Sequence, residues 1–562
     1  MAAGSLDRPQ LDQDAQVRQN CSMSTFSPTD QPLDVLARAT EYASSGQAGL
    51  LVEEDALTAG KLRLVGVYDD RQRGYFMLRT RVPGGRLTWQ QAETIGAVAQ
   101  QFTTRPPEHE VGPEQFLEIT TRQDIQFHWI RPADLPEIWR RYDEVDLLSI
   151  QACGDTMRNI TGCPIAGVDH NEVLDVTSLI QELNRFSLEN PQYGAGLPRK
   201  FKTAITGCRE DCILARINDI AFTPAERDGE LGFHVWVGGG LSDYARLASS
   251  LDVFVTPDQV IDTVRAAIDL FKEVGNYQDK AVNRFRRVVD ELGIEKVRED
   301  IRSRLPFTPA SPGTDLTVTP RYDHVGVHPQ GSQDDDGKVY LGLAVPVGRM
   351  GGDELVEIAH LARDCGDGEV HLTPRQNLVI TGVDRDQVET LLERPILQRF
   401  SPRPPAAGRS IVACTSAPFC KFGIVDAKAI GSDLTDRLDG LTDGTESLKI
   451  HISGCKASCA QVQIADIGLR ATLARDEAGY HEAFDVALGG SIVAGRLAPW
   501  VELEVPAEET LDRIKQLVGT YRDERDDGES FGAFLDRIGL DRAAGFFRQT
   551  TSQQATPQEA AL

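Results

Sequence analysis

The chain has 562 residues, too many for one hydrophobic core, so domain-size statistics favour three to four structural units. Its 85 acidic and 59 basic residues give a formal net charge of -26. This balance disfavours nucleic acid as a partner, because neutralising phosphates needs a basic surface. We interpret the acidic excess as the solvated surface of a salt-adapted protein.

The beginning of the chain lacks the basic segment and apolar stretch of a secretory signal, and no later segment approaches the ~18 apolar residues of a membrane span. The chain contains ten cysteines, too few for a disulfide scaffold. Eight of them fall in two sets at short spacings, as metal ligands or redox residues do. We therefore expect a soluble, cytoplasmic protein in a reducing compartment, with no membrane partner.

A long internal duplication is visible. The segment YFMLRTRV and the following LEITTRQDIQFHWI reappear later as VYLGLAVPV and VHLTPRQNLVITGV, with T-x-R-Q in register. SIQACGDTMRNITGC parallels SIVACTSAPFCKFGI, and FKTAITGCREDCILARINDIAF parallels LKIHISGCKASCAQVQIADIGL. The chain therefore consists of two copies of a unit of about 200 residues. Each copy holds a C-x3-C pair and a further cysteine upstream.

Strands and helices alternate within each copy. Apolar alternation in YFMLRTRV, FLEI and IQFHWI predicts strands, and the apolar spacing of WQQAETIGAVAQQF predicts a helix. We therefore expect an α+β fold with α/β layers. The domains we expect are 34–146, 147–302, 324–400 and 401–545, with a Pro- and Thr-rich linker at 303–323 and disordered ends at 1–33 and 546–562. The Asp run within Gly331–Lys338 predicts a solvated hairpin tip rather than a metal site.

Four cysteines of the second copy form a C-x5-C and a C-x3-C motif: Cys414, Cys420, Cys455 and Cys459. Structural zinc usually binds C-x2-C pairs, which this chain lacks. Four thiolates at variable loop spacing suit an iron–sulfur cluster. A buried, apolar cysteine is the alternative for any single position.

The motifs VACTSAPFCKFGIVDAKA and ISGCKASCAQVQIADIGL resemble the cluster signature of the sirohaem-dependent nitrite and sulfite reductases, the ferredoxin-type haemoprotein subunit. The similarity covers nearly all of Val65–Gly490. It implies duplicated units, each with a ferredoxin-like part and a cofactor-binding sheet-and-helix part. It also implies that the four cysteines hold a 4Fe–4S cluster and that Cys459 bridges to the sirohaem iron. The family usually has C-P-N-x-C where this chain has CKASC, a change that tunes the reduction potential without affecting ligation.

The first copy is expected to supply haem and substrate contacts. Its four cysteines, Cys153, Cys163, Cys208 and Cys212, could hold a second cluster, but the resemblance disfavours this. Reducing an oxyanion requires positive charge over the open haem face. At positions that match the family's anion-binding motifs, the resemblance implies four catalytic residues: Arg79, Arg158, Lys200 and Lys202.

Sirohaem carries eight carboxylates and needs many cationic and hydrogen-bonding partners. The residues that resemble the family's sirohaem contacts are Arg122, Gln123 and His128, with Arg375 and Asn377 as second-copy equivalents. His128 could instead be a core histidine. The run Gly238–Gly240 permits close backbone approach but is not a dinucleotide-binding motif.

The resemblance implies a six-electron reductase that converts sulfite to sulfide or nitrite to ammonia. The chain has no FAD or NAD(P)H motif, so we expect ferredoxin as the electron donor. A local basic patch formed by Arg284, Arg286 and Arg287 is a candidate docking site for it. The alternative is that these arginines are an ordinary helix surface. The Lys200-x-Lys202 pair favours sulfite, whereas TGCREDC and AQVQIADIGL are closer to nitrite enzymes.

Two further expectations concern pairing. Tyr68 and Cys153 match positions that can be covalently joined in related sulfite reductases, and unlinked side chains are the alternative. We expect a monomer.

The competing functions are a nitrite-specific ferredoxin enzyme, a precorrin-processing monooxygenase of the same fold, and a non-catalytic iron–sulfur electron-transfer protein.

Overall fold

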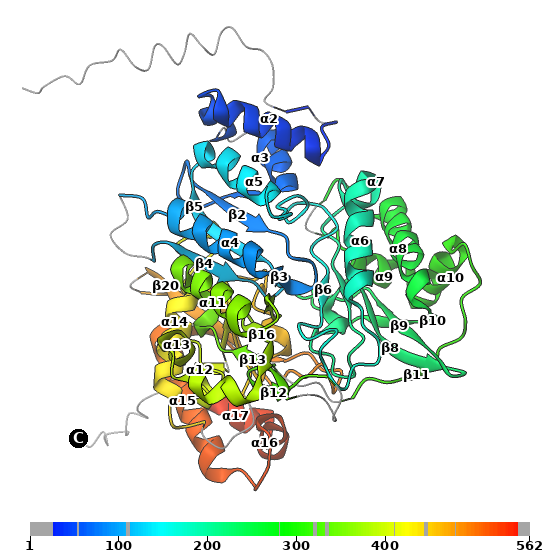
Figure 1. Ribbon diagram of the computed structural model, residues 1–562. Helices are drawn as coiled ribbons and strands as arrows, with labels where there is room; N and C mark the ends of the chain where they lie inside the picture. Colours follow the sequence, from blue (N-terminus) through cyan, green and yellow to red (C-terminus); the bar gives the residue numbers. More distant parts are fainter. Residues whose placement is uncertain are drawn as a thin grey trace, which may run out of the picture.

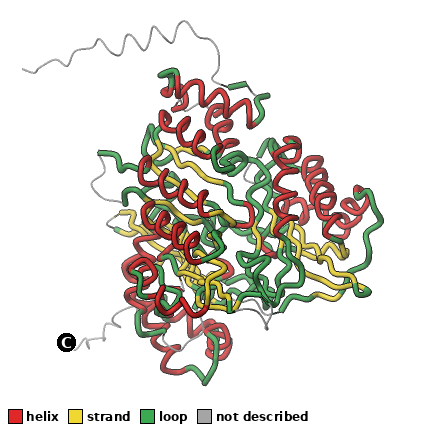
Figure 2. The backbone as a smooth tube through the Cα atoms, in the orientation of Figure 1, coloured by secondary structure: helices red, strands yellow, loops and turns green. Residues whose placement is uncertain are grey.

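The structure, a computed structural model, describes residues 26–27, 29–52, 56–107, 113–279, 282–318, 323–331, 337–409, 411–442, 448–477 and 479–548. Helices lie towards the outside and strands towards the inside (Figure 2). The predicted α+β class with duplicated ferredoxin-like halves is confirmed: the described residues form two such sheets and two cofactor-binding sheets.

The two ferredoxin-like sheets exchange their edge strands. The first has the order β1-β2-β5-β4-β14 and the second β12-β13-β16-β15-β3. The strand bounds in the first sheet are β1 Val67–Asp69, β2 Phe76–Thr80, β5 Ile125–Ile130, β4 Phe116–Ile119 and β14 Arg349–Gly351. Those in the second are β12 Gly326–Pro329, β13 Lys338–Leu343, β16 Leu378–Asp384, β15 Glu369–Leu372 and β3 Arg86–Thr88. Thus β14 of the second copy completes the first sheet, and β3 of the first copy completes the second.

Helices α4 (Trp89–Phe102) and α11 (Gly352–Cys365) lie side by side next to these sheets (Figure 1). The Thr88 side chain caps α4 by accepting a hydrogen bond from the Gln91 amide at 3.3 Å. The two helices approach closely at glycines, because a β-carbon on Gly96 would lie 2.5 Å from the Gly352 carbonyl oxygen. The duplication thus places equivalent helices in direct backbone contact.

Each cofactor-binding domain is built on a mixed sheet, with the order β10-β9-β8-β7-β6 in the first copy and β17-β18-β19-β20-β21 in the second. Three neighbouring strands in each sheet are parallel and the others antiparallel. The bounds are β6 Thr161–Gly162, β7 Thr203–Ile205, β8 Ile220–Arg227, β9 Glu230–Val237 and β10 Ser249–Val255, then β17 Ile411–Ala413, β18 Ile450–Ser453, β19 Ile467–Asp476, β20 Gly479–Leu488 and β21 Trp500–Pro506.

The remaining helices pack around the ferredoxin-like and the cofactor-binding sheets (Figure 1). In the first copy they are α2 Pro32–Ser44, α3 Ala56–Leu62, α5 Leu135–Asp143, α6 Thr177–Glu189, α7 Pro191–Gly194, α8 Val260–Val274, α9 Phe285–Leu292 and α10 Ile294–Arg304. In the second they are α12 Val388–Leu392, α13 Pro395–Arg399, α14 Ala427–Leu438, α15 Ala507–Glu524, α16 Phe531–Ile538 and α17 Leu540–Gly545. Within the described residues, no helix combines the length and apolar character that crossing a membrane requires.

The described chain reaches into segments for which the sequence predicts disorder or a linker. Phe26 is fully buried and meets the Tyr42 ring edge-on, and Phe547 is 1% exposed, because both apolar rings dock into neighbouring cores. In the predicted linker, β11 (Thr314–Asp315) pairs with β8. The predicted Asp-rich tip, 332–336, lies outside the described residues, although β12 and β13 on either side of it are paired.

Candidate active site

The four cysteines of the second copy lie beyond the carboxyl ends of two parallel strands, the usual ligand-binding edge of such sheets. Cys414 directly follows β17, and Cys455 and Cys459 follow β18. The Gly454 amide donates a hydrogen bond to the Cys414 sulfur at 3.2 Å. Burial raises the pKa of the Cys414 thiol, and the neighbouring thiols of Cys459, Cys455 and Cys420 raise it further. The predicted ligands are therefore close neighbours in space.

The separation of these thiols distinguishes a cluster from a single ion. Among the described residues, groups of three or more ligand atoms within 4.8 Å of one another do not include the four cysteines. Such short separations are what one tetrahedral ion requires. The four thiols are thus not packed as the ligands of one tetrahedral ion are, and four neighbouring thiolates suit a four-iron cluster.

The loop that carries Cys455 and Cys459 is held by the first copy. Ser242 donates its hydroxyl hydrogen to the Lys456 carbonyl at 3.1 Å, and the Lys456 amine pairs with Asp243 at 3.2 Å. The preceding glycine run packs against backbone, because a β-carbon on Gly239 would lie 2.3 Å from the Arg216 carbonyl oxygen. The Lys456 charge, which the family motif lacks, is thus partly offset by a neighbouring carboxylate.

The predicted basic residues converge on the side of Cys459. Arg79 lies in β2, Arg158 precedes β6, and Lys200 and Lys202 precede β7. Burial, together with Arg158 and Arg284, lowers the pKa of Lys200 to about 7, whereas the Cys459 thiolate opposes this shift. The same thiolate acts on Arg79. The four residues, each half-buried, therefore form one cationic group near the predicted bridging cysteine.

Two further arginines, Arg284 and Arg286, have a different environment from the one that the sequence predicts. The prediction that Arg284 and Arg286 form a docking patch is wrong, because their exposed fractions are only 8% and 5%. Arg284 instead donates to the Asp219 carboxylate at 3.0 Å, while the Lys202 amide donates to the same carboxylate at 2.9 Å. Their place before and within α9 turns them towards the lysines. The apolar residues around them, such as Phe285, were the sequence signal that could have indicated their burial.

Asp124 is a site residue that the sequence did not indicate. It is 3% exposed, and burial raises its pKa to about 6 although Arg79 and Arg122 act in the opposite direction. It follows the T-x-R-Q motif at the position where the second copy has Asn377, and this difference was the signal available. A carboxyl group of this pKa among arginines can hold or release a proton near neutral pH.

Arg122 and Arg375 occupy equivalent positions in the two copies. Arg122 donates to the Asn218 side chain at 2.8 Å, and a guanidinium nitrogen of Arg375 lies 3.2 Å from the His451 ring. In the structure as described, the Nε atoms of Arg122, Arg284 and Arg286 are buried and have no hydrogen-bond partner. Buried, mutually repelling guanidinium groups with unused donors fit a polyanion, such as a tetrapyrrole with many carboxylates.

Gln123 joins backbone segments rather than facing the cationic group. Its amide nitrogen donates to the carbonyls of Gly84, Gly162 and Leu372, and its oxygen accepts from the Gly162 amide. Every hydrogen-bonding position of this amide is therefore occupied. Gln123 thus links the two copies through Leu372, and the sirohaem contact predicted for it stays a prediction.

His128 and Asn377 are also engaged elsewhere. His128 is 2% exposed, hydrogen-bonds Asp70 at 2.9 Å and stacks on Phe419 with ring centroids 4.4 Å apart. The Asn377 side chain accepts from the Val345 amide at 2.9 Å. His128 is thus the core histidine of the alternative interpretation, and it supports the loop that ends at Cys420.

Tyr68 and Cys153 both lie near Arg79. Both groups act on the charge of Arg79, and the Cys153 thiol is 3.8 Å from the Gly66 carbonyl oxygen, two residues before Tyr68. Arg63 covers the Tyr68 ring at 4.3 Å from its centroid. Cys153 is a free thiol in this structure.

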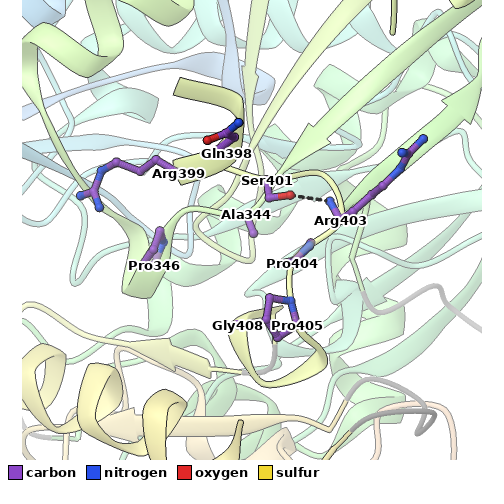
Figure 3. Close-up of a pocket in the computed structure, with 9 residues that line it drawn as sticks. All are labelled: Ala344, Pro346, Gln398, Arg399, Ser401, Arg403, Pro404, Pro405 and Gly408. Atoms are coloured by element: carbon purple, nitrogen blue, oxygen red, sulfur yellow. Dashed lines mark hydrogen bonds between the residues drawn. The ribbon is translucent and has the colours of Figure 1, made fainter. Parts of the chain in front are cut away.

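A pocket of about 280 Å³ lies in the second copy, apart from all these residues (Figure 3). Its lining includes Arg399 and Arg403, which are paired with Glu354 and Glu389. The dashed line in Figure 3 is the hydrogen bond from the Arg403 amide to the Ser401 hydroxyl at 3.0 Å. Because its cations are already paired, this pocket does not compete with the cysteine and lysine site.

Comparisons with known families cover both copies. The family described as "Nitrite and sulphite reductase 4Fe-4S domain" matches residues 153–308 and 406–554, and the family "Nitrite/Sulfite reductase ferredoxin-like half domain" matches 68–145 and 331–396. The chain belongs to the nitrite and sulfite reductase family. The four matched segments alternate along the chain, as the duplication requires.

Members of the nitrite and sulfite reductase family with different names are similar to this chain. The assimilatory ferredoxin-dependent nitrite reductase of Haloferax mediterranei is 37% identical over 90% of this chain and 89% of its own length. The sulfite reductase [ferredoxin] 1 of Mycolicibacterium paratuberculosis is 32% identical over 90% of this chain and 93% of its own. The solved structure of the Mycobacterium tuberculosis NirA protein superposes with a TM-score of 0.82 at 30% identity, covering 91% of this chain and 95% of that one.

This nitrite and sulfite reductase is an oxidoreductase with sirohaem and a 4Fe–4S cluster as its cofactors. The residues present fit both groups. The four neighbouring thiols fit a cluster, and the buried guanidinium donors without partners fit the sirohaem carboxylates.

Proposed function

We propose that the chain reduces sulfite to sulfide in six one-electron steps. The observation that carries this proposal is the half-buried group of cations near Cys459, in which Lys200 and Lys202 lie together with Arg79 and Arg158. A pyramidal dianion gains more Coulomb attraction from two adjacent amines than a planar monoanion does, especially where water is largely excluded.

Sirohaem and the cluster, when bound, supply electrons singly to the substrate. Under this proposal the protein's own side chains bind the anion and provide protons. Arg79 and Arg158 remain charged and orient its oxygens. Lys200, with a pKa of about 7, and Asp124, with a pKa of about 6, release protons near neutral pH, as removal of each oxygen as water requires.

Nitrite reduction to ammonia is the second candidate, because relatives over most of this chain are named nitrite reductases. They include the Haloferax mediterranei protein and the ferredoxin–nitrite reductase of Synechococcus elongatus, which is 37% identical over 79% of this chain. Burial and the neighbouring Arg122, Arg284 and Lys200 lower the pKa of Lys202 well below its usual value. A neutral Lys202 would suit a monoanion, so the charge of this one amine separates the two candidates.

Ferredoxin is the proposed electron donor, since both of these relatives are named for their dependence on it. We also keep the proposals of a cytoplasmic location and a monomer. The docking surface must lie elsewhere than on Arg284 and Arg286, whose side chains are buried.

The test is steady-state kinetics of the purified holoenzyme with a reduced dye as donor and each anion in turn. A kcat/KM for sulfite at least about tenfold above that for nitrite supports the proposal; the reverse ratio selects nitrite. A long-wavelength isobacteriochlorin band in the absorption spectrum checks sirohaem content first. A protein that shows both cofactors and reduces neither anion contradicts both candidates.

A further inference from the structure

The first copy contains a set of residues arranged like the cluster ligands of the second. Gln123 exchanges two hydrogen bonds with the backbone of Gly162, and Gln376 does the same with Ala413. Gly162 and Ala413 are therefore equivalent, and each is the last residue of a parallel strand. The structural counterpart of Cys414 is thus Cys163. The sequence alignment had paired Cys414 with Cys153, because SIQAC and SIVAC are alike.

The remaining ligand positions follow from this registration. Cys208 and Cys212 follow β7 as Cys455 and Cys459 follow β18. The position six residues after Cys163 is Asp169, where the second copy has Cys420. The Cys208 sulfur lies 2.9 Å from the Asp169 carboxylate, so these two positions also meet in space. The first copy therefore retains three of the four thiols and replaces the fourth by a carboxylate.

A histidine enters this arrangement from the start of the second copy. The sulfur atoms of Cys163 and Cys212 and a ring nitrogen of His324 all lie within 4.8 Å of one another. Ligand atoms around a tetrahedral zinc ion are about 3.5–3.8 Å apart, given its bond lengths. The three side chains are 2%, 4% and 2% exposed, and Cys208 is fully buried beside them. This density of thiol and imidazole groups is typical of structural metal sites.

The backbone around His324 is fixed by its neighbours. Asp323 is 3% exposed, pairs with the Arg409 guanidinium and accepts a hydrogen bond from the Val325 amide at 2.8 Å. His324 is therefore positioned by residues of the second copy, whereas the cysteines belong to the first. A shared metal ion at this place would join the two copies.

We propose that Cys163, Cys212 and His324 bind a single zinc ion. Cys208 neighbours Cys163 but lies outside the group whose ligand atoms are within 4.8 Å of one another, so it becomes the fourth ligand by moving closer when the ion binds. Thiolate and imidazole ligands in a closed, buried site select zinc among divalent ions that need no redox change. Binding displaces the thiol protons and involves no electron transfer. A second iron–sulfur cluster is disfavoured because these ligand atoms are closer together than the four cluster cysteines.

The zinc site is separate from the anion site. Lys202 precedes β7, whereas Cys208 lies beyond its carboxyl end, so the strand stands between the two. We expect the ion to stabilise the junction of the copies rather than to take part in reduction. Its presence does not depend on which anion is the substrate.

The experiment measures zinc and iron in the purified holoenzyme by mass spectrometry, with Cys212→Ser and His324→Gln as test variants. We expect about one zinc per chain in the parent protein and a loss of at least about tenfold in each variant, with iron content and the absorption spectrum unchanged. Cys365→Ser is the control, because Cys365 is a half-buried cysteine outside both sets, and it should keep its zinc.

Three results on zinc and the cysteines would overturn the proposal, as would the iron and chelator results described after them. The three are a parent protein that holds no zinc even after anaerobic titration with zinc chloride, zinc that both variants retain, and a Cys163–Cys208 disulfide found by alkylation and mass mapping. Iron in excess of the sirohaem and one cluster, lost on Cys212→Ser, would instead establish a second cluster and also overturn it. If the variants do not fold, treatment of the parent with a zinc chelator gives the answer: we expect zinc release and a lower Tm, and an unchanged Tm together with no released zinc contradicts the site.

Discussion

Lys200 loses its charge near neutral pH when the site is empty, because burial and the neighbouring Arg158 and Arg284 lower its pKa to about 7. The protonated amine attracts the anion, so binding is strongest below this pKa and weakens as the pH rises through it. We predict that KM for the anion rises by up to about tenfold per pH unit above the Lys200 pKa, and that bound sirohaem carboxylates move the onset upward. In Lys200→Arg, which keeps its charge, the rise should be absent. A parent KM that stays constant from pH 6 to 10 contradicts this role.

Lys202 is the residue that we expect to decide between the two anions. Replacement by Asn removes one amine and leaves a hydrogen-bonding amide. We predict that Lys202→Asn lowers kcat/KM for sulfite by roughly ten- to a thousandfold, the ~1.4–4 kcal/mol of a lost charge-stabilising contact, and leaves nitrite reduction unchanged or improved. Steady-state kinetics on both anions measures this. Equal losses on both would show a general proton-donating or structural role instead.

Cys459 is the proposed thiolate shared by the cluster and the sirohaem iron. Changes outside the ligand shell typically cost about 10–100-fold in activity, so loss of the shared ligand should cost at least about 100-fold. We predict this loss for Cys459→Ser, with altered cofactor content or spectrum, whereas Cys365→Ser behaves as the parent. Normal iron and sirohaem with undiminished turnover would exclude the bridging assignment.

The site residues differ in how far the sequence could reveal them. The cysteines and the four basic residues lie in short sequence motifs. Each motif lies within or next to one strand, so residues that are close in the sequence are also close in space. Gln123 and His128 share those motifs, but their partners are Leu372 and Asp70, distant in the chain or on another strand. Burial of Arg284 depends on its ion pair with Asp219, 65 positions away. Contacts with residues so distant in the chain leave no local pattern in the sequence from which they could be predicted.

At the level of elements, the contact between α4 and α11 depends on two glycines. A β-carbon on Gly96 would meet the Gly352 carbonyl oxygen at 2.5 Å and a Val356 methyl group at 2.8 Å. We predict that Gly96→Ala destabilises the protein by about 1–3 kcal/mol, as overpacking of a close contact does. Denaturant unfolding measures the change. Gly519→Ala in α15, where nothing lies within 4 Å, is the control and should be neutral or stabilising by up to ~1 kcal/mol.

The strands of the ferredoxin-like halves follow from apolar alternation, but their exchange does not. Strands β3 and β14 have three residues each, too few for a periodic pattern. Their pairing is decided by the neighbours that the duplicated helices bring close, with Leu87 opposite Val370 and Met350 opposite Leu117. A prediction made from one copy alone would therefore leave an edge of its ferredoxin-like sheet unpaired.

For the whole molecule, strand exchange means that neither copy has a complete ferredoxin-like sheet without the other. The glutamine links reinforce this, since Gln123 reaches Leu372 and Gln376 reaches the Ile119 carbonyl of the opposite copy. The two copies therefore form one folding unit, and the residues predicted to hold the cofactors come from both of them. The duplicated sites are therefore not identical. The second copy has four cysteines at the ligand positions, whereas the first copy has three cysteines and a carboxylate, with a histidine nearby.

Added salt is expected to act on stability and on substrate binding in opposite directions, because the net charge is -26 whereas the anion site is cationic. Salt shortens the Debye length from about 10 Å at 0.1 M to 3 Å at 1 M, which relieves repulsion among surface carboxylates. We predict that 1 M KCl raises the Tm by at least about 2 °C, equivalent to roughly 1 kcal/mol. The same screening weakens the attraction of the half-buried cations for the anion, so KM should rise over this range while kcat changes less. Sucrose is the control, because it stabilises without screening and should leave KM unchanged. Thermal unfolding and steady-state kinetics in matched buffers separate the two effects, and a Tm that falls with KCl would mean that the acidic excess does not reflect adaptation to salt.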